Sequence, residues 1–346
     1  MDKLGLVGFS GCGKSTVFRW LTGVAPDPAK VQQGQTGMAK LPDARLDRMS
    51  AMFEPKKTTY AELAFLDTPG LDLTERRDNP RRLGILKEST GLVVVLNGYA
   101  DGNLADELRR FRDEMVFADL EIITNRLQKL EANLKKPRPQ KEKDVDLLEQ
   151  SVLQKMVTML EAGELPRDAE LKPEEEKAIR SFQLLTVKPE VVFVNQGDAA
   201  IGKPLPADLL KLAPGALAAP AKLELELAEL SPEDRAAFAA DLGIGESQRD
   251  DILRSMFAGL GKIVFLTVGE DECRAWPVRK GATAVEGAGE IHTDLSNRFV
   301  RAEVVGYDDF CRVGSMKEAK SQGVYRLEGK TYVVQDADIM HILAST

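Results

Sequence analysis

A glycine-rich segment near the start of the chain restricts the fold more than any other feature of the sequence. Residues 8–15 read Gly-Phe-Ser-Gly-Cys-Gly-Lys-Ser, between an apolar stretch at residues 3–8 and a stretch of helical pattern at residues 14–21. A G-x-x-x-x-G-K-S pattern between a strand and a helix is typical of a phosphate-binding loop, in which backbone N–H groups surround phosphate oxygens. The sequence therefore predicts an α/β nucleotide-binding domain.

The residue types in this loop indicate separate tasks. Lys14 is expected to reach the β- and γ-phosphates, and the Ser15 hydroxyl is expected to ligate Mg²⁺. Cys12 is expected to contribute its backbone rather than its thiol. The loop residues expected to contact bound ATP or GTP are Gly8, Ser10, Gly11, Cys12, Gly13, Lys14, Ser15 and Thr16.

Three further apolar runs each end in a polar loop. Residues 63–66 precede Asp67-Thr68-Pro69-Gly70, residues 92–96 precede Asn97-Gly98, and residues 191–194 precede Asn195. Apolar runs that alternate with helical stretches predict a mainly parallel sheet, and ligands bind at the carboxyl ends of such strands. We therefore expect these loops to lie near the phosphate-binding loop.

The D-x-x-G pattern at residues 67–70 favours a GTPase-type site. Asp67 can support Mg²⁺ through water, and the Gly70 N–H can contact a γ-phosphate. With Lys14, Gly70 is expected to act in catalysis. The next residue is Leu71, at a position where many GTPases carry a glutamine that orients the attacking water. Hydrolysis is therefore expected to be slow.

Asn195-Gln196-Gly197-Asp198 occupies the place of the base-reading N-K-x-D motif. Asp198 could accept hydrogen bonds from the two N–H donors of guanine, whereas Gln196 lacks the lysine stem that usually lies along the base. Ala221 follows Pro220 in a segment similar to the S-A-K base-contact loop. Asn195, Asp198 and Ala221 are the candidate base contacts, and the choice between ATP and GTP stays open.

A long helical segment separates the third and fourth apolar runs. Apolar residues recur at helical spacing over residues 104–134 and again over 148–159, on either side of a connection with two prolines, which predicts an antiparallel helical hairpin with a coiled-coil arm. Residues 126–143 contain seven Lys or Arg and two acids, in a chain whose net charge is −8. This tip is the expected contact with a ribosome or RNA, through Lys135, Lys136, Arg138, Lys141 and Lys143. A solvated coiled-coil end is the alternative.

The remaining sequence predicts a protein of the cytoplasm. No apolar run is long enough to span a bilayer, no signal sequence precedes the first strand, and the three cysteines lack metal-type spacing. From residue 262 onward, short β-type runs at 263–267, 299–305 and 332–334 indicate a separate small domain. His292 and His341, the only histidines, lie there and are expected to be structural.

Segments along essentially the whole chain resemble the YchF family of Obg-like ATPases. Similar segments near the phosphate loop are 41–47 and 55–58, those at the arm are 118–121 and 126–131, and those of the C-terminal part are 274–276, 289–294, 301–304, 307–310, 326–330 and 334–336. Leu71 also fits, because this class carries a hydrophobic residue in place of the glutamine.

The resemblance implies three domains and a role in translation. A P-loop NTPase domain of the GTPase type (G domain) is expected at 1–103 and 185–261, an inserted antiparallel helical coiled-coil arm at 104–184, and a β-grasp-like TGS domain at 262–346. It further implies Mg²⁺-dependent ATP or GTP hydrolysis, often with ATP preferred, and association with ribosomes.

The chain also departs from the family pattern. Gly11 replaces the usual asparagine, residues 31–37 lack a first-switch threonine unless Thr36 substitutes, and residues 72–80 replace the glycine-rich second switch. The loop after the third apolar run lacks the histidine that the family is thought to use in hydrolysis. A nucleotide-binding module with little or no hydrolysis is therefore one alternative, and a P-loop kinase acting on a small molecule is another.

Overall fold

The computed structural model describes residues 2–169, 171–231, 233–234, 237–238 and 248–345. The chain divides into two compact units: the first unit is Met1–Gly37 with Ala64–Gln248, and the second unit is Met38–Leu63 with Arg249–Thr346. Residues 38–63 thus group with the C-terminal part of the chain, whereas the sequence placed them in the G domain. The division into three domains stays a prediction.

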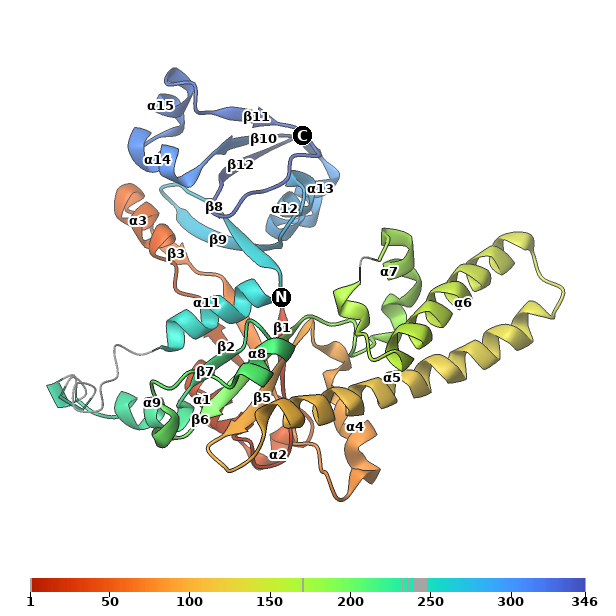
Figure 1. Ribbon diagram of the computed structural model, residues 1–346. Coiled ribbons are helices and arrows are strands. Elements are labelled where there is room, and N and C mark those ends of the chain that lie inside the picture. Colours follow the sequence, from red (N-terminus) through yellow and green to blue (C-terminus); the bar gives the residue numbers. More distant parts are fainter. Residues whose placement is uncertain (1, 170, 232, 235–236, 239–247, 346) are drawn as a thin grey trace. The chain divides into compact units, whose positions relative to one another are not determined.

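A six-stranded sheet forms the centre of the first unit (Figure 1). Its strand order is β2-β4-β1-β5-β6-β7, and β1 pairs in parallel with β4 and β5, as do β5 with β6 and β6 with β7. The strands are β1 (Lys3–Val7), β2 (Gln35–Lys40), β4 (Glu62–Asp67), β5 (Gly91–Gly98), β6 (Glu190–Gln196) and β7 (Leu217–Ala219). The predicted parallel sheet is confirmed.

The strands of this sheet are continuous apolar runs because other elements cover both faces of the sheet. Leu92–Leu96 of β5 are all buried, and a cluster including Leu92, Phe111 and Met115 packs against one face. The helices of this part are α1 (Lys14–Thr22), α2 (Pro28–Val31), α4 (Asn79–Gly84), α8 (Ala207–Leu212) and α9 (Ala221–Ala228), with 3-10 turns at Arg76–Asp78, Ile85–Glu88 and Asp198–Ala200.

The helical arm consists of α5 (Leu104–Leu134) and α6 (Gln140–Glu161), which run antiparallel beside each other (Figure 1). The Asn103 side chain caps α5 by accepting a hydrogen bond from the Asp106 N–H. Apolar residues at helical spacing join the two helices and α7 (Pro173–Ile179) in one cluster: Ile123, Leu130, Val152, Leu153, Met156, Leu160, Ile179 and Leu184. The predicted hairpin is confirmed, although Leu148 is exposed and Leu153 is buried instead.

The second unit contains a sheet of order β11-β10-β12-β8-β9-β3. Its elements are α3 (Ala44–Phe53), β3 (Lys57–Thr59), α11 (Arg249–Gly259), β8 (Lys262–Thr267), β9 (Glu272–Arg279), α12 (Ala284–Ile291), α13 (Thr293–Asn297), β10 (Phe299–Val305), α14 (Tyr307–Val313), α15 (Met316–Ser321), β11 (Arg326–Glu328) and β12 (Ile339–Ala344). The short strand β3 joins this sheet by parallel pairing with β9.

The prediction of a strand at residues 332–334 is wrong. Val333 makes only an isolated bridge to Thr283, and its side chain is exposed, so the segment has no continuous partner strand. Val334 is nevertheless buried in the core of the second unit, which also includes Phe265 of β8, Val278 of β9 and Phe299 of β10. Among the described residues, no helix is long and apolar enough to cross a membrane.

Candidate functional site

The glycine-rich loop connects β1 to α1, as its sequence pattern predicts. Gly13 has φ of +86°, and a Cβ built there would lie 2.2 Å from Asn195 Nδ2. Gly8 has φ of +146°, and a Cβ there would lie 2.4 Å from the Val95 carbonyl oxygen. Side chains are therefore excluded at both positions by conformation and by space. The loop backbone can approach a phosphate group closely.

Lys14 is buried and bonded to its own loop. Its Nζ donates to the carbonyl oxygens of Phe9 at 3.0 Å and Gly8 at 3.3 Å, and lies 3.6 Å from Cys12 Sγ. Burial raises the pKa of the Cys12 thiol, so the thiol is protonated at neutral pH. The two carbonyl oxygens, and not a neighbouring anion, therefore hold the Lys14 side chain. Phosphate oxygens of a bound nucleotide can replace these acceptors.

The end of β4 carries a buried carboxylate beside Ser15. Asp67 has no exposed surface, and neither of its oxygens makes a well-formed hydrogen bond in the described structure. Burial raises the pKa of Asp67, while the neighbouring Ser15 hydroxyl and the Lys14 ammonium oppose that shift. A buried carboxylate that makes no well-formed hydrogen bond and lies next to a hydroxyl fits a hard divalent cation with oxygen ligands such as Mg²⁺.

Gly70 and Leu71 lie against the glycine-rich loop. Leu71 N–H donates to the Gly8 carbonyl oxygen at 3.0 Å, and Ser10 N–H donates to the Leu71 carbonyl oxygen at 2.9 Å. A Cβ at Gly70 would lie 2.6 Å from Ser10 Cα and 2.8 Å from Lys14 Nζ. The Leu71 side chain is buried in the apolar core. It therefore cannot orient a water molecule, as its residue type already indicated.

A cavity of about 540 Å³ opens over this loop. Its lining combines the predicted Ser10, Gly11, Gly13, Lys14, Ser15, Thr16 and Gly70 with Pro26, Pro28, Val31, Gln32, Thr68, Pro69, Arg82 and Tyr99. Gly8 and Cys12 shape the loop behind this wall, and Thr36 is exposed on β2 and does not line the cavity. A nucleotide phosphate chain can occupy a cavity of this size.

Arg82 of α4 is a residue that sequence reasoning missed. Its Nη1 donates to the Gly70 carbonyl oxygen at 2.6 Å, and its side chain is half-buried in the cavity wall. The adjacent Arg81 is exposed and forms no hydrogen bond or ion pair with a described residue. The only sequence signal was a pair of arginines just after the segment that replaces the glycine-rich second switch.

Tyr99 is the second residue that was missed. Its hydroxyl donates to the Gly11 carbonyl oxygen, and its ring lies 3.5 Å from the position where a side chain at Gly13 would begin. The parallel register between Asn97 and Asn195 brings the loop after β5 beside the loop after β6, and Tyr99 Cβ lies 2.8 Å from the position of a Cβ at Gly197. The Tyr99 side chain therefore begins beside the candidate base-reading loop and reaches the phosphate-binding loop.

The candidate base contacts lie at the same edge of the sheet but outside the cavity wall. Asn195 is buried and donates from Nδ2 to the Cys12 carbonyl oxygen at 3.2 Å, so it supports the phosphate-binding loop. Asp198 is exposed, and its carboxylate accepts no hydrogen bond from a described residue. Ala221 is buried at the start of α9, after Pro220.

The arm tip presents fewer free cations than its sequence predicts. Arg138 is paired with Glu142 at 2.8 Å and with Asp146, so acids of α6 balance its charge. Lys136 donates to Asn133 Oδ1 at 3.3 Å. Lys135, Lys141 and Lys143 form no ion pair with any described residue.

The two histidines lie in the second unit, where His341 contacts Glu303 at 2.8 Å.

A phosphate-binding loop between β1 and α1, with the buried Asp67 one strand away, defines a P-loop nucleotide-binding protein of the GTPase type. A sequence model described as "50S ribosome-binding GTPase" matches residues 3–137, and YchF-GTPase_C, described as "Protein of unknown function (DUF933)", matches residues 263–345. The chain is 32% identical over 360 residues to "Ribosome-binding ATPase YchF" of Haemophilus influenzae, which covers 98% of each chain. The chain belongs to the YchF family.

Other relatives agree with this assignment. "Ribosome-binding ATPase YchF" of Bacillus subtilis is 31% identical over 361 residues, covering 97% of each chain. "Obg-like ATPase 1" of Oryza sativa subsp. indica is 30% identical and covers 98% of this chain and 91% of that protein. The solved structure of the Schizosaccharomyces pombe YchF GTPase is 25% identical, with a TM-score of 0.80 over 99% of this chain and 97% of that chain.

Proposed function

We propose that this protein binds ATP or GTP with Mg²⁺, hydrolyses it slowly, and associates with ribosomes or RNA. The observation that supports this most is the pairing of a complete phosphate-binding loop with a buried carboxylate, Asp67, that makes no well-formed hydrogen bond with a described residue. The relatives named as ribosome-binding ATPases support both the hydrolysis and the ribosome association.

Phosphate binding is assigned to residues 8–16. Backbone N–H groups of the loop surround the phosphates, and Lys14 exchanges its carbonyl acceptors for phosphate oxygens. Ser15 and Asp67 would hold Mg²⁺, which when bound neutralises charge on the phosphate oxygens. Asp67 would do so directly or through water.

Charge stabilisation during hydrolysis is assigned to Lys14, the Gly70 N–H and Arg82. Lys14 Nζ and the Arg82 guanidinium approach the same residue, Gly70, from different elements. A γ-phosphate contacting the Gly70 N–H would therefore lie within reach of two cations, one of which the chain supplies as an arginine in cis. Turnover is expected to be slow because Leu71 is buried and apolar and cannot orient water.

Base recognition is assigned to the space beside Tyr99. Its ring, half-exposed between the two loops, offers a face for stacking, which is compatible with either base. Asp198 offers acceptors suited to guanine, while the family favours adenine. The preference for ATP over GTP is therefore expected to be weak.

Ribosome or RNA contact is assigned to the arm tip and to the TGS-like domain at residues 262–346. The free lysines at 135, 141 and 143 supply the local positive charge that an acidic protein needs to approach phosphates. Domains at 1–103 with 185–261, at 104–184 and at 262–346 are proposed on the same family basis.

Titration calorimetry with Mg²⁺–ATP and Mg²⁺–GTP tests the central assignment. Replacing Lys14→Ala should reduce triphosphate affinity more than tenfold, because one cation would no longer reach the phosphates. Replacing the exposed Lys40→Ala is the matched control and should change nothing. Equal triphosphate affinity in the parent and Lys14→Ala would sink the proposal.

Hydrolysis assays separate the remaining alternatives. Phosphate release that is slow alone and faster with ribosomes supports the proposal, whereas no release in either condition supports a nucleotide-binding module. Transfer of phosphate to a small molecule, rather than to water, would support a kinase.

A further inference from the structure

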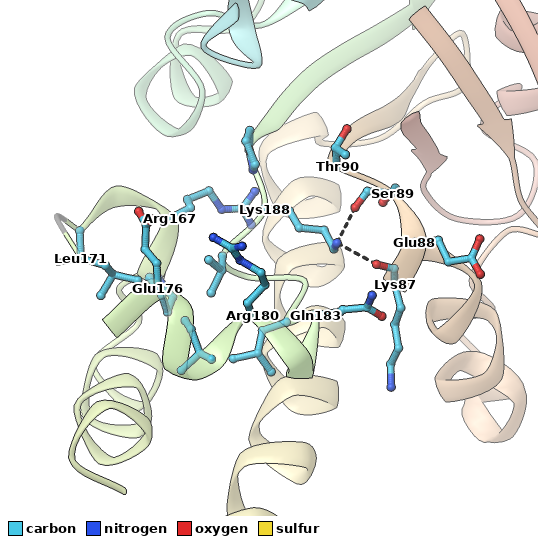
Figure 2. A pocket seen from close by; sticks show the side chains of 16 residues that line it. Lys87, Glu88, Ser89, Thr90, Arg167, Leu171, Glu176, Arg180, Gln183 and Lys188 are labelled. Carbon is cyan, nitrogen blue, oxygen red and sulfur yellow. Dashed lines mark hydrogen bonds between the residues drawn. The ribbon is translucent and has the colours of Figure 1, made fainter. Parts of the chain in front are cut away.

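A second cavity in the first unit lies at the opposite edge of the sheet from the phosphate-binding loop. It has a volume of about 510 Å³ and is formed by residues 87–90, which precede β5, by residues 187–189, which precede β6, and by residues 166–169 and 171–184 of the arm base (Figure 2). That segment includes α7 and the 3-10 turns at Pro166–Asp168 and Arg180–Phe182. The strands are parallel, so the cavity lies at their amino ends.

Arg167 provides a buried cation in this cavity wall. Its side chain is only 8% exposed, and none of Nε, Nη1 and Nη2 has a hydrogen-bond acceptor among the described residues. Nη1 lies 3.0 Å from Glu190 Oε2, but that contact lacks hydrogen-bond alignment. Glu190 Oε1 already accepts from Arg112 Nη2 at 2.6 Å and Nε at 3.1 Å. Two guanidinium groups therefore share one carboxylate.

This shortage of acceptors is energetically unfavourable. A buried guanidinium without hydrogen bonds loses its hydration, and here it gains only an ion pair with a carboxylate that Arg112 also contacts. Burial also lowers the pKa of Arg167, and the nearby Arg112 adds to that shift. An anion that enters the cavity would supply the missing acceptors.

Two further cations face the same space. The Arg180 side chain forms no hydrogen bond or ion pair with any described residue. Lys188 Nζ is held by the carbonyl oxygens of Ser89 at 2.5 Å and Lys87 at 3.0 Å and forms no ion pair with a described residue, although the Asp119 carboxylate acts on it electrostatically. Arg167, Arg180 and Lys188 all line the cavity, and Figure 2 shows the Lys188 side chain directed toward the backbone of residues 87–89.

Acidic and apolar groups complete the wall. Two acidic and four cationic residues line the cavity. The acidic residues are Glu176 and Glu88, which contacts Lys3 at 3.5 Å. Leu171, Ile179, Leu184 and Val187 supply an apolar surface. The volume lies within the range of about 300 to 1,000 Å³ that small-molecule sites occupy.

We propose that this cavity binds a small organic phosphate ester, whose phosphate group contacts Arg167, Arg180 and Lys188 and whose organic part packs on the apolar wall. Arginine forks match phosphate oxygens, and a dianion pairs with more than one cation. Because the Arg167 guanidinium is buried, an anion reaches it only by entering the cavity. A small molecule does so more readily than a polymer backbone.

Phenyl phosphate is a suitable probe, and calorimetry is the measurement. The full-length Lys14→Ala variant keeps the phosphate-binding loop from competing for the probe, so the result does not depend on the proposed nucleotide function. Saturable binding is expected, and Arg180→Gln should weaken it roughly tenfold through loss of a charged hydrogen-bond donor. Lys177→Gln, on exposed α7 outside the cavity, is the matched control and should leave binding unchanged.

Three comparisons can overturn the proposal. Inorganic phosphate binding as tightly as phenyl phosphate would show an adventitious ion only. Equal losses in Arg180→Gln and Lys177→Gln, or no saturation by millimolar probe, would show that the cavity is not a site. A short single-stranded RNA that binds through Arg180 while phenyl phosphate does not would assign the cations to a nucleic acid. Arg167→Gln is a second loss variant, with circular dichroism confirming that it is folded.

Discussion

Replacing Arg82 by alanine is the sharpest test of the hydrolysis mechanism. Arg82 Nη1 lies 2.6 Å from the Gly70 carbonyl oxygen, and Lys14 Nζ lies 2.8 Å from the point where a Gly70 Cβ would be. The two cations therefore flank the residue whose N–H is expected to contact the γ-phosphate. Loss of one donor aimed at developing charge costs about 10²-fold in kcat, or about 2.7 kcal/mol in activation free energy.

Single-turnover hydrolysis measures this loss separately from binding. We expect Arg82→Ala to lower the rate about 10²-fold while the affinity for a non-hydrolysable triphosphate changes little. Binding of the diphosphate with aluminium fluoride should weaken in parallel, because that complex resembles the transition state. Arg82→Lys should recover only part of the rate, since an ammonium lacks the planar fork.

Arg81→Ala is the control, because Arg81 is exposed on the same helix and lies outside the cavity wall. A rate in Arg82→Ala within threefold of the parent would refute the assignment. So would an equal loss in Arg81→Ala, which would point to a general effect of charge on α4.

Three further predictions address the metal, the base and the arm. Burial holds the pKa of Asp67 above its value in the unfolded chain, so the Mg²⁺-free protein loses stability as the pH rises between the folded and unfolded pKa values and stays less stable at neutral pH. Asp67→Asn should therefore raise the melting temperature in EDTA. The same variant should lose the stabilisation that Mg²⁺–nucleotide gives the parent, and thermal denaturation measures both effects. In competition titrations, Tyr99→Leu should weaken the binding of both ATP and GTP by roughly 1 to 3 kcal/mol, the value of one stacking contact. Asp198→Ala should weaken the binding of GTP alone. Strong ATP selectivity that Asp198→Ala leaves unchanged would refute the base-reading role of Asp198. Changing Lys135, Lys141 and Lys143 to Gln should flatten the log–log salt dependence of ribosome co-sedimentation by up to about three units; no change relative to a control with Lys172, Lys177 and Lys211 changed to Gln would show that the tip is a solvated helix end.

The sequence predicted the features that depend on local pattern. The strands β1, β4, β5 and β6 are apolar runs of the expected length, and each is followed by the polar loop that forms the site. The glycines of residues 8–13 mark backbone conformations that few other residues adopt. The periodicity of residues 104–134 indicated a helix because one side of it packs against a partner.

What the sequence did not predict depends on contacts between distant segments. Arg82 and Tyr99 lie on a short helix and a loop, and their approach to Gly70 and Gly11 follows from the packing of α4 and from strand register. Residues 332–334 have strand-like composition, yet strand formation also needs a partner at the right distance. The second cavity combines three separate segments, none of which carries a recognisable motif.

The place of β3 in the second unit has a consequence for how the chain can be cut. Residues 57–59 pair with β9, and Phe53 stacks on Phe310 with ring centroids 5.9 Å apart. In each pair the two partners are separated in the sequence by residues 64–248 of the first unit. Removing residues 249–346 would leave an unpaired strand and an uncovered aromatic ring, which favour aggregation. In the sequence, residues 38–63 lie between Gln32 and Thr68, which both line the nucleotide cavity, so the chain enters and leaves this part of the second unit through segments that border the cavity. A C-terminal fragment made for ribosome studies would need both pieces of the chain, expressed together or joined by a new linker.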